Sequence, residues 1–555
     1  MSEHNDLTKA PRHTQSWKGA PLQPTDIART LFGALEHARR FYGGNTKIVQ
    51  DQTDAPLSYN ALVRAAYALG GKIAKTTSPR DVMGVLLPTC VPAVITLFAL
   101  QATGRTPAVL NYLAGAEGLR AACALSGVRC ILTSRRFLET ARLTDTIAKL
   151  EPSVRIVHLE DLRHSITPVD KLIAGMKSLF PILHREQSKH NDVALILFTS
   201  GTTGAPKGVA LTHANLLANI AQCRAHIPFN SEWVFFNSLP VFHAFGLVGG
   251  ALLPILGGMK TVLYPSPLDH ERIPKVLAAT GANVLVSTDT FARLYARAAD
   301  PQALKSLRYV VLGGEHAHEK TRALLARKSS ALVLQGYGAT ECGPVVAINQ
   351  PEANKPETVG KLLPGMEARL EHVSGFSEGG LLFVRGPNVM LGYLDSDRPG
   401  QVSPRLDQWF DTGDLASVDQ EGFITITGRL KRFAVIGGEM ISLEAIEAYA
   451  GRIWPDNRHV AISVLLDGDR ETIVLVTDQR KAKRLDFASW TQARDIPALF
   501  IPDRIVAIRK VPLLPTGKPD YIAVRRVLSR KLGALKLFEN IANRAPKIQA
   551  KPRSQ

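Results

Sequence analysis

A run rich in glycine and hydroxyl groups carries the clearest chemical signal in the chain. Residues 198–208 read Phe-Thr-Ser-Gly-Thr-Thr-Gly-Ala-Pro-Lys-Gly. Glycines let a backbone turn sharply and approach a ligand, hydroxyls and free amides donate hydrogen bonds, and Lys207 adds a positive charge. This equipment predicts a polyphosphate-binding loop, although no Ser or Thr follows Lys207 as in a Walker loop, so a flexible surface loop is the alternative. The candidate ligands are Thr199, Ser200, Gly201, Thr202, Thr203, Gly204 and Lys207.

The segments on either side must position this run. Residues 193–197 are all apolar and predict a buried strand, whereas the polar residues from 212 to 215 predict the capped start of a helix. From residue 26 to about 430, strand-like apolar runs alternate with helical patterns, as in an α/β domain. A smaller unit with strand and helix patterns follows Gly428.

Five further segments, in order, complete a resemblance to the adenylate-forming superfamily, which includes acyl-CoA synthetases, non-ribosomal adenylation domains and luciferases. They read Pro-Val-Phe-His-Ala-Phe-Gly (240–246), Gly-Tyr-Gly-Ala-Thr-Glu (336–341), Trp-Phe-Asp-Thr-Gly-Asp (409–414), Gly-Arg-Leu-Lys (428–431) with Gly-Gly-Glu-Met-Ile-Ser-Leu-Glu (437–444), and Pro-Thr-Gly-Lys (515–518). The resemblance spans about residues 26 to 530. It implies an α/β fold with two sheets, helices and a small β-barrel, followed by a mobile C-terminal α+β lid.

These patterns give a division of the chain that the structure can be compared with. We expect a loose polar leader at residues 1–25 and an adenylation domain at 26–430. A lid at 431–530 and a basic tail at 531–555 complete the expected organisation.

Strings between the shared motifs most resemble bacterial acyl-acyl carrier protein synthetases, which form the synthetase half of acyl-ACP synthetase/2-acylglycerophosphoethanolamine acyltransferases. Examples are Tyr-Pro-Ser-Pro-Leu (264–268) and Gly-Met-Glu-Ala-Arg-Leu (365–370). An acyltransferase half would place Asp five positions after a His, and none of the 15 histidines has that neighbour. The resemblance implies an ATP-dependent ligase that converts a medium- or long-chain fatty acid to acyl-AMP and passes it to the phosphopantetheine thiol of an acyl carrier protein. A CoA-dependent synthetase is the alternative, and a non-catalytic acyl- or nucleotide-binding relative is the second.

The resemblance also implies catalytic roles. Lys518 would reach the α-phosphate and the substrate carboxylate, and Glu341 would bind Mg²⁺ with Thr340 on the phosphate. His243 would orient the acyl carboxylate, although its aromatic neighbours also suit a packed histidine. Lys431 would be the hinge of the lid.

Nucleotide contacts follow from the same motifs. Tyr337, beside Gly338, would stack on adenine, and Asp414 with Arg429 would bind the ribose. Gly314 and Glu315 follow a predicted strand at 309–312 and would line the adenine. One departure is Val435, because many relatives carry a lysine there.

The net charge of +18 points to an acidic partner. Residues 521–555 hold nine Lys or Arg and one Glu. An acidic carrier protein or peripheral contact with an anionic membrane fits this surface, whereas nucleic acid does not, because no nucleic-acid-binding signature accompanies it. A solvated tail is the alternative. The predicted helix at 522–543 would pack through Val524, Leu528, Leu535, Phe538 and Ala542, with Arg526 and Arg530 on another face.

Composition favours a cytoplasmic enzyme, with membrane contact at most peripheral. The five cysteines are odd in number and lack metal-ligand spacing, and His316 with His318 is a weak zinc candidate. The first 25 residues lack the apolar core of a signal peptide. The apolar stretches 84–100 and 245–263 contain prolines or glycines and are predicted as buried elements.

Overall fold

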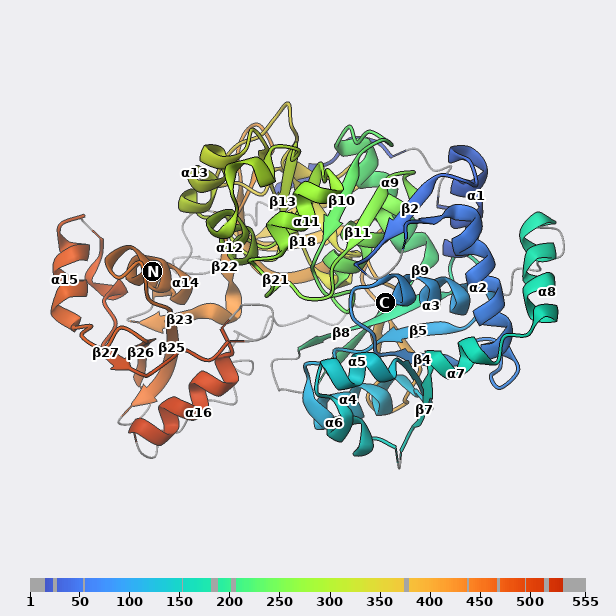
Figure 1. Ribbon diagram of the computed structural model, residues 1–555. Helices are drawn as coiled ribbons and strands as arrows, with labels where there is room; N and C mark the ends of the chain where they lie inside the picture. The colour runs from blue at the N-terminus through green and yellow to red at the C-terminus, as the bar shows by residue number, and fades with distance from the viewer. Residues whose placement is uncertain are drawn as a thin grey trace, which may run out of the picture.

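The computed structural model describes residues 15–22, 27–52, 55–151, 153–180, 188–200, 206–373, 379–436, 439–466, 470–494, 496–513 and 519–532. Its large N-terminal part contains two mostly parallel sheets covered by helices, and the C-terminal elements gather on one side of it (Figure 1). The fold is therefore α/β, with a large N-terminal domain and a small C-terminal domain, as the sequence predicts.

The first sheet has eight strands in the order β20-β19-β9-β8-β5-β4-β6-β7. Its parallel strands are β4 (Val82–Val85), β5 (Thr106–Val109), β6 (Cys130–Thr133), β7 (Arg155–His158) and β8 (Val193–Ser200). The antiparallel ones are β9 (Pro206–Thr212), β19 (Gly392–Leu394) and β20 (Val402–Pro404). The strand predicted at 193–197 is confirmed and extends to Ser200.

The second sheet has nine strands in the order β16-β15-β14-β13-β12-β10-β11-β2-β3. Its parallel strands are β2 (Lys47–Gln50), β10 (Val234–Asn237), β11 (Lys260–Leu263), β12 (Val284–Ser287), β13 (Tyr309–Leu312) and β14 (Leu332–Gly338). The antiparallel ones are β3 (Leu57–Ser58), β15 (Val345–Ile348) and β16 (Lys361–Leu362).

Helices connect and cover these strands. They are α1 (Leu31–Tyr42), α2 (Tyr59–Ala74), α3 (Val91–Ala102), α4 (Gly115–Ser126), α5 (Arg135–Thr140), α6 (Thr144–Ala148), α7 (Leu159–His164), α8 (Pro168–Leu179), α9 (His213–His226), α10 (Leu253–Leu256), α11 (Ile273–Thr280), α12 (Asp289–Ala298) and α13 (Glu319–Lys328). The helix predicted after Thr212 is confirmed, because the Thr212 hydroxyl accepts from the Asn215 amide while the Asn215 side chain accepts from the Thr212 amide.

The apolar stretches of the sequence are buried elements, as predicted. Residues 84–100 supply β4 and α3, and residues 245–263 supply the π-helix η3 (Phe245–Leu252), α10 and β11. Within the part of the chain that the structure describes, no helix has the length and apolar content needed to cross a bilayer.

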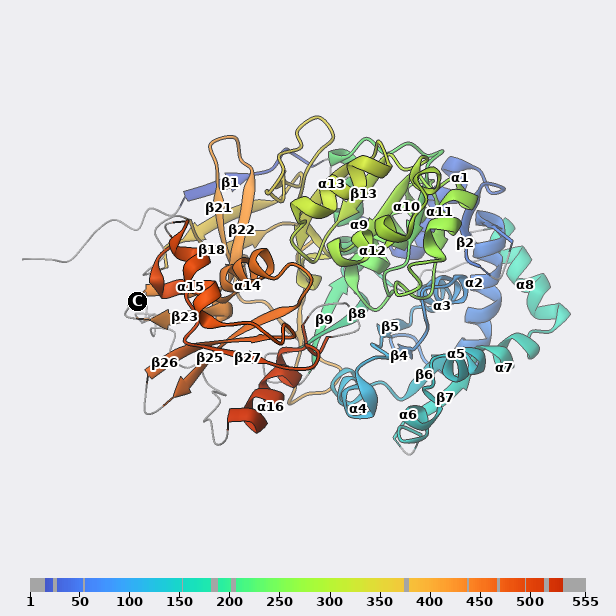
Figure 2. The ribbon, with the colours of Figure 1, turned by 60° about the vertical axis from the view of Figure 1, so that its left-hand side comes forward.

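A third, antiparallel sheet has the order β1-β17-β18-β21-β22 (Figure 2). Its strands are β1 (Gln15–Lys18), β17 (Glu367–Glu371), β18 (Gly380–Arg385), β21 (Phe410–Val418) and β22 (Ile424–Arg429). The expectation that residues 1–25 form only a loose leader is therefore wrong for residues 15–18. They pair with β17, and Trp17 packs against the large core, so burial of this ring accompanies the pairing.

The C-terminal unit forms its own core around a sheet of β25 (His459–Leu466), β26 (Arg470–Thr477) and β27 (Arg504–Ala507). Alternate residues of β25 and β26 contribute to two clusters on opposite faces. The other elements are β23 (Phe433–Ile436), β24 (Glu439–Ser442), α14 (Leu443–Ile453), α15 (Arg484–Gln492) and α16 (Tyr521–Leu532). The proposed boundary at 430/431 falls between the large core, which extends to Ile426, and these clusters, which begin at Ala434.

The predicted packing of the last helix is confirmed over the described residues. Val524 and Leu528 are buried in one of the two clusters, whereas Arg526 and Arg530 are exposed. Leu535, Phe538 and Ala542 lie outside the described residues, as does the tail beyond Leu532.

Candidate active site

Six of the predicted site residues lie at or just beyond the carboxyl ends of two neighbouring parallel strands. β13 ends at Leu312, before Gly314 and Glu315, and β14 ends at Gly338, before the short 3₁₀ helix η5 (Thr340–Cys342). Because β13 and β14 are parallel and in register, both sets reach one edge of the sheet. The structure therefore brings Gly314, Glu315, Tyr337, Gly338, Thr340 and Glu341 to this edge.

Two glycines at this edge allow close backbone approach. Gly314 has φ 78°, in the left-handed region that favours glycine. A Cβ on Gly338 would lie 2.0 Å from the carbonyl oxygen of Pro344, so no side chain fits there. Glu315 accepts a 2.9 Å hydrogen bond from the Thr290 amide in the first turn of α12, which holds this loop against the helix.

The segment containing His243 lies beside the same edge. A Cβ on Gly313 would lie 3.0 Å from the Phe245 ring, so the two segments pack closely. The His243 ring lies 4.6 Å from the Phe242 ring, centroid to centroid, and the Phe242 ring contacts Tyr112 at 4.9 Å. The aromatic packing suggested by the sequence is thus present, and the role of His243 toward a carboxylate stays a prediction.

Tyr337, Asp414 and Arg429 form one connected group. The Tyr337 hydroxyl donates to one oxygen of the Asp414 carboxylate, and Arg429 Nε lies 3.0 Å from the other. Strand pairing explains the second contact, because Asp414 on β21 is directly opposite Arg429 on β22. The Asp414 side chain is 4% exposed and that of Arg429 is 66% exposed, so the arginine reaches from solvent to a buried carboxylate.

Burial controls the electrostatics of this group. It raises the pKa of the Asp414 carboxyl above its ordinary value, and Arg429 and Tyr337 only partly oppose the shift. Burial and the nearby Asp414 raise the pKa of the Tyr337 phenol well above 10, so its hydroxyl remains a donor. A ribose hydroxyl could replace one donor at this carboxylate without a change in charge.

A second group joins the glycine-rich run to Glu341. The Tyr393 hydroxyl donates a 2.8 Å hydrogen bond to Glu341 Oε1, and Lys207 Nζ lies 5.0 Å from the centre of the same ring. The Met390 amide also donates to the Glu341 carbonyl at 2.8 Å. A cation and a carboxylate are therefore held on one aromatic side chain.

Both ends of the glycine-rich run belong to strands, whereas the sequence predicts a loop over the whole run. Thr199 on β8 pairs with Lys207 on β9, so both residues belong to a hairpin. Lys207 is consequently on a strand, which corrects the expectation that it lies within the loop. Gly201, Thr202, Thr203 and Gly204 lie outside the described residues, and so does the side chain of Ser200.

The donor set at this site suits a metal–phosphate complex. Glu341 supplies a carboxylate and Thr340 a hydroxyl on consecutive residues, and both are the hard oxygen donors that Mg²⁺ prefers. Lys207 brings a positive charge over the ring of Tyr393, whose hydroxyl bonds to Glu341. By contrast, His316 and His318 lack further ligands: among the residues that the structure describes, no group of three or more His, Cys, Asp or Glu side chains could hold a metal ion.

The predicted hinge lies directly beyond the Asp414–Arg429 pair. Lys431 is the middle residue of η6 (Leu430–Arg432), and its side chain is outside the described set. The next residue, Arg432, forms an ion pair with Glu447, donates a 2.9 Å hydrogen bond to the Ala461 carbonyl, and covers the Tyr521 ring at 4.3 Å. Arg432 is therefore held against the C-terminal unit by an ion pair, a hydrogen bond and a ring contact.

Lys518 itself lies outside the described residues. Leu513 and Pro519, on either side of the segment that contains it, form an isolated antiparallel bridge. The structure therefore defines the base of this segment, and the role of Lys518 stays a prediction.

Sequence reasoning missed Tyr393. It lies on the three-residue strand β19 and pairs with Val209, two residues from Lys207 on the same face of β9. The only sequence signal was one tyrosine in a short apolar run, Gly-Tyr-Leu (392–394). Its position depends on pairing between segments about 180 residues apart, which a local pattern does not reveal.

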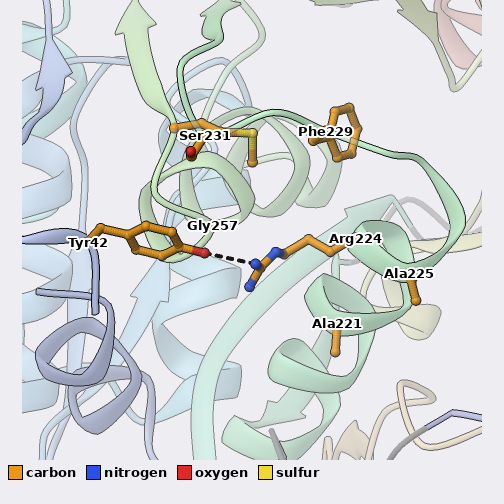
Figure 3. A pocket seen from close by; sticks show the side chains of 8 residues that line it. Tyr42, Ala221, Arg224, Ala225, Phe229, Ser231 and Gly257 are labelled. Atoms are coloured by element: carbon orange, nitrogen blue, oxygen red, sulfur yellow. Dashed lines mark hydrogen bonds between the residues drawn. The ribbon is translucent and has the colours of Figure 1, made fainter. Parts of the chain in front are cut away.

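A separate cavity of 420 Å³ lies at the other end of the second sheet (Figure 3). It is lined partly by Phe229, Ser231 and Met259, which precede β10 and β11. In this cavity Arg224 donates a 2.8 Å hydrogen bond to the Tyr42 hydroxyl. The cavity is therefore at the amino ends of the strands, away from the candidate site at their carboxyl ends.

Comparison with known proteins is consistent with this geometry. Residues 35–394 match the model of a family described as "AMP-binding enzyme". The chain is 29% identical over 413 residues to the medium-chain fatty-acid–CoA ligase of Escherichia coli K12, which covers 70% of each chain. It is 27% identical over 539 residues to the long-chain-fatty-acid–CoA ligase of Salmonella typhimurium, covering 90% of this chain and 94% of that protein.

Solved structures share the fold at lower identity. ATP-bound MatB from Rhodopseudomonas palustris superimposes with a TM-score of 0.77 at 21% identity, over 92% of this chain and all of that one. O-succinylbenzoate coenzyme A synthetase from Bacillus subtilis, in complex with ATP and magnesium ion, gives 0.74 at 21% identity, over 88% and 98%. These likenesses support the two-part α/β architecture.

Proposed function

Because this chain belongs to the AMP-binding enzyme family, we propose that it is an AMP-forming acid–thiol ligase that activates fatty acids with ATP. The observation that carries the proposal is that Lys207 and Glu341 both contact Tyr393, one at its ring and the other at its hydroxyl. These contacts lie near the sheet edge at which Tyr337 also lies. The fatty-acid–CoA ligases among its relatives support a fatty acid as substrate.

The first half-reaction needs charge stabilisation and no protein nucleophile. A carboxylate oxygen of the fatty acid attacks the α-phosphorus of ATP, and the bond to pyrophosphate breaks, which yields acyl-AMP. Two anions must approach, so cations at the phosphates lower the barrier. In our proposal Lys207 and the glycine-rich run bind the phosphates, Lys518 neutralises the reacting carboxylate, and His243 orients it. Mg²⁺, held by Glu341, would offset negative charge on the phosphates.

In our proposal the Tyr337–Asp414–Arg429 group and the loop before it position the nucleotide. Tyr337 would stack on adenine between Gly314 and Gly338, with Glu315 supporting the loop, and Asp414 with Arg429 would hold the ribose. Thr340 would bond to the α-phosphate. Fixing the α-phosphorus relative to the carboxylate converts their encounter into an oriented reaction within one complex.

The second half-reaction transfers the acyl group to a thiol. The sulfur attacks the carbonyl carbon of acyl-AMP, the bond to AMP breaks, and the thiol proton passes to solvent or to the released phosphate. Rotation of the C-terminal unit about Lys431 would withdraw Lys518 and admit the thiol.

We propose an acyl carrier protein as the acceptor, with CoA as the alternative that the relatives' names favour. The supporting observation is the exposed pair Arg526 and Arg530 on α16, which offers a cationic surface to an acidic partner. Both acceptors present the same phosphopantetheine thiol. All five cysteines are free and four are buried, which suits the cytoplasmic location that we propose for this reaction.

A thioester assay that offers CoA and holo-carrier protein side by side, with fatty acids of several chain lengths, tests the proposal. Preference for carrier protein, and a raised KM for it in Arg526→Glu/Arg530→Glu, are the expected results. Arg452→Glu/Lys483→Glu is the matched control, because both side chains are exposed on the side of the sheet away from α16. Preference for CoA would assign the alternative acceptor. Absence of fatty acid-dependent ATP–pyrophosphate exchange would leave a non-catalytic binding protein.

A further inference from the structure

Helix α8 turns its large apolar side chains toward solvent. Val169, Leu172, Ile173, Met176 and Leu179 recur at helical spacing and are 46% to 75% exposed; Phe180, just after the helix, is 57% exposed. At 100° per residue the five helical positions fall within a stripe about 120° wide. We call these six side chains the α8 stripe. Both ribbon views place α8 at the outer edge of the molecule (Figures 1 and 2).

The opposite face of α8 packs against the rest of the protein through small residues. Ala174 and Ser178 are buried, and Ser178 accepts a 2.8 Å hydrogen bond from Arg39 on α1. Asp170 pairs with Lys72 of α2 at 2.6 Å and, reciprocally with Thr167, forms a capping box. The helix is thus held in a fixed orientation, and its outward apolar face is part of the folded structure.

Charges around the stripe favour an anionic partner. Asp170 is the single acidic residue of α8, and Lys72 and Lys75 both pair with it. Lys171 is exposed and Lys177 is half-buried. On the preceding helix, Asp161 is paired with Arg135 at 2.7 Å and Glu160 accepts from Ser134 at 2.7 Å. Among the described residues of α7 and α8, the acidic groups are therefore paired or hydrogen-bonded, and two lysines flank the stripe.

We propose that the α8 stripe is a peripheral docking site for an anionic lipid bilayer. A short helix with a broad apolar face and flanking lysines suits insertion in the plane of the lipid headgroups. Its 12 residues span about 18 Å, which is too short to cross a bilayer and long enough to lie on one. Charge complementarity selects anionic lipid over a neutral surface. If the proposed function is correct, the site would also bring the enzyme to the phase into which its fatty acid substrate partitions.

Flotation of the full-length protein with vesicles tests this directly, without ATP or fatty acid. Vesicles of phosphatidylcholine with about 30% phosphatidylglycerol should bind the protein, and pure phosphatidylcholine should bind it less. Leu172→Asp/Leu179→Asp should weaken binding to the anionic vesicles at least about tenfold, because charged groups would have to enter the interface. Leu172→Ala/Leu179→Ala should give a smaller loss in the same direction. Lys171→Glu/Lys177→Glu should weaken binding and reduce its sensitivity to salt.

Leu406→Asp/Leu485→Asp is the matched control, because these leucines are 105% and 72% exposed and lie on other segments. Equal binding of wild type and the Leu172→Asp/Leu179→Asp variant would overturn the proposal, as would an equal loss in the control pair. Light scattering without vesicles gives the third test: a dimer that both stripe variants dissociate would make the stripe a contact between copies of the chain. Because vesicle binding requires no turnover, loss of ligase activity alone would bear on the proposed function and leave this inference intact.

Discussion

Tyr393 connects Glu341 to the glycine-rich hairpin. Its hydroxyl donates to the Glu341 carboxylate at 2.8 Å, and its ring lies under Lys207 at 5.0 Å. The three residues come from β9, η5 and β19, so one side chain sets the distance between a metal-binding candidate and a phosphate-binding candidate.

Removing the hydroxyl should weaken use of Mg·ATP. A hydrogen bond to a charged group contributes about 1.5–3 kcal/mol, so Tyr393→Phe should lower kcat/KM for Mg·ATP roughly tenfold or more while the ring still faces Lys207. ATP–pyrophosphate exchange at varied Mg²⁺ gives the measurement. Tyr42→Phe, at a distant Tyr–Arg contact, is the control. Wild-type kinetics in Tyr393→Phe would show that this bond does not position Glu341 for catalysis.

Asp414→Asn should separate stability from nucleotide binding. Since the pKa of Asp414 is raised in the folded protein, ionising it costs folding free energy as pH rises through that pKa. The neutral amide avoids this cost, so Tm at pH 7.5 should equal or exceed that of wild type. AMP affinity should fall roughly tenfold or more, because the ribose would lose a charged acceptor. Thermal unfolding and calorimetric titration with AMP test both halves; unchanged affinity would remove Asp414 from the ribose site.

Lys518→Ala should affect only the first half-reaction. A cation at the reacting carboxylate is needed for adenylation, so ATP–pyrophosphate exchange should fall by roughly 10²–10³. Thioester formation from supplied acyl-AMP should continue near the wild-type rate. Lys510→Ala, at an exposed lysine of the same unit, controls for loss of charge. Equal losses in the two half-reactions would contradict the assignment.

Lys431→Pro should give the reverse result. Arg432 is fastened to the C-terminal unit through Glu447, so rotation must occur on the N-terminal side of Arg432, where a fixed φ would restrict it. Adenylation should survive and thioester formation should fall. Lys431→Ala removes the same side chain without restricting the backbone and should retain both activities. Unaffected thioester formation in Lys431→Pro would place the pivot elsewhere.

His213 should make the large domain sensitive to acid. Its ring is buried, Nδ1 accepts a 3.0 Å hydrogen bond from the Leu31 amide, and burial lowers its pKa to about 4. Since the unfolded pKa is near 6.5, the stabilising contribution is complete above pH 6.5 and is lost as pH falls toward 4. The loss should amount to roughly 3 kcal/mol. Urea unfolding at several pH values should show a smaller pH slope for His213→Gln than for wild type and for the exposed control His164→Gln. Equal slopes would contradict this assignment.

The sequence predicted features that depend on short segments. The strand before the glycine-rich run, the capped helix after Thr212 and the buried apolar stretches each follow from local patterns, and parallel strand order brings Tyr337 and Glu315 to one edge. The remaining features of the site depend on pairing between strands that are far apart in the sequence, which local patterns do not reveal. Tyr393 reaches Lys207 through β19–β9 pairing. The outward face of α8 could not be predicted, because an apolar helical stripe ordinarily indicates a core-facing side.

The pairing of β1 also has a consequence for how the chain folds. Gln15 is opposite Leu370, so the first described strand is made about 350 residues before its partner. During synthesis, the third sheet therefore stays incomplete until most of the N-terminal domain has left the ribosome. β1 can pair only after β17 has been synthesised, so Trp17 cannot take up its packed position beside that strand before then.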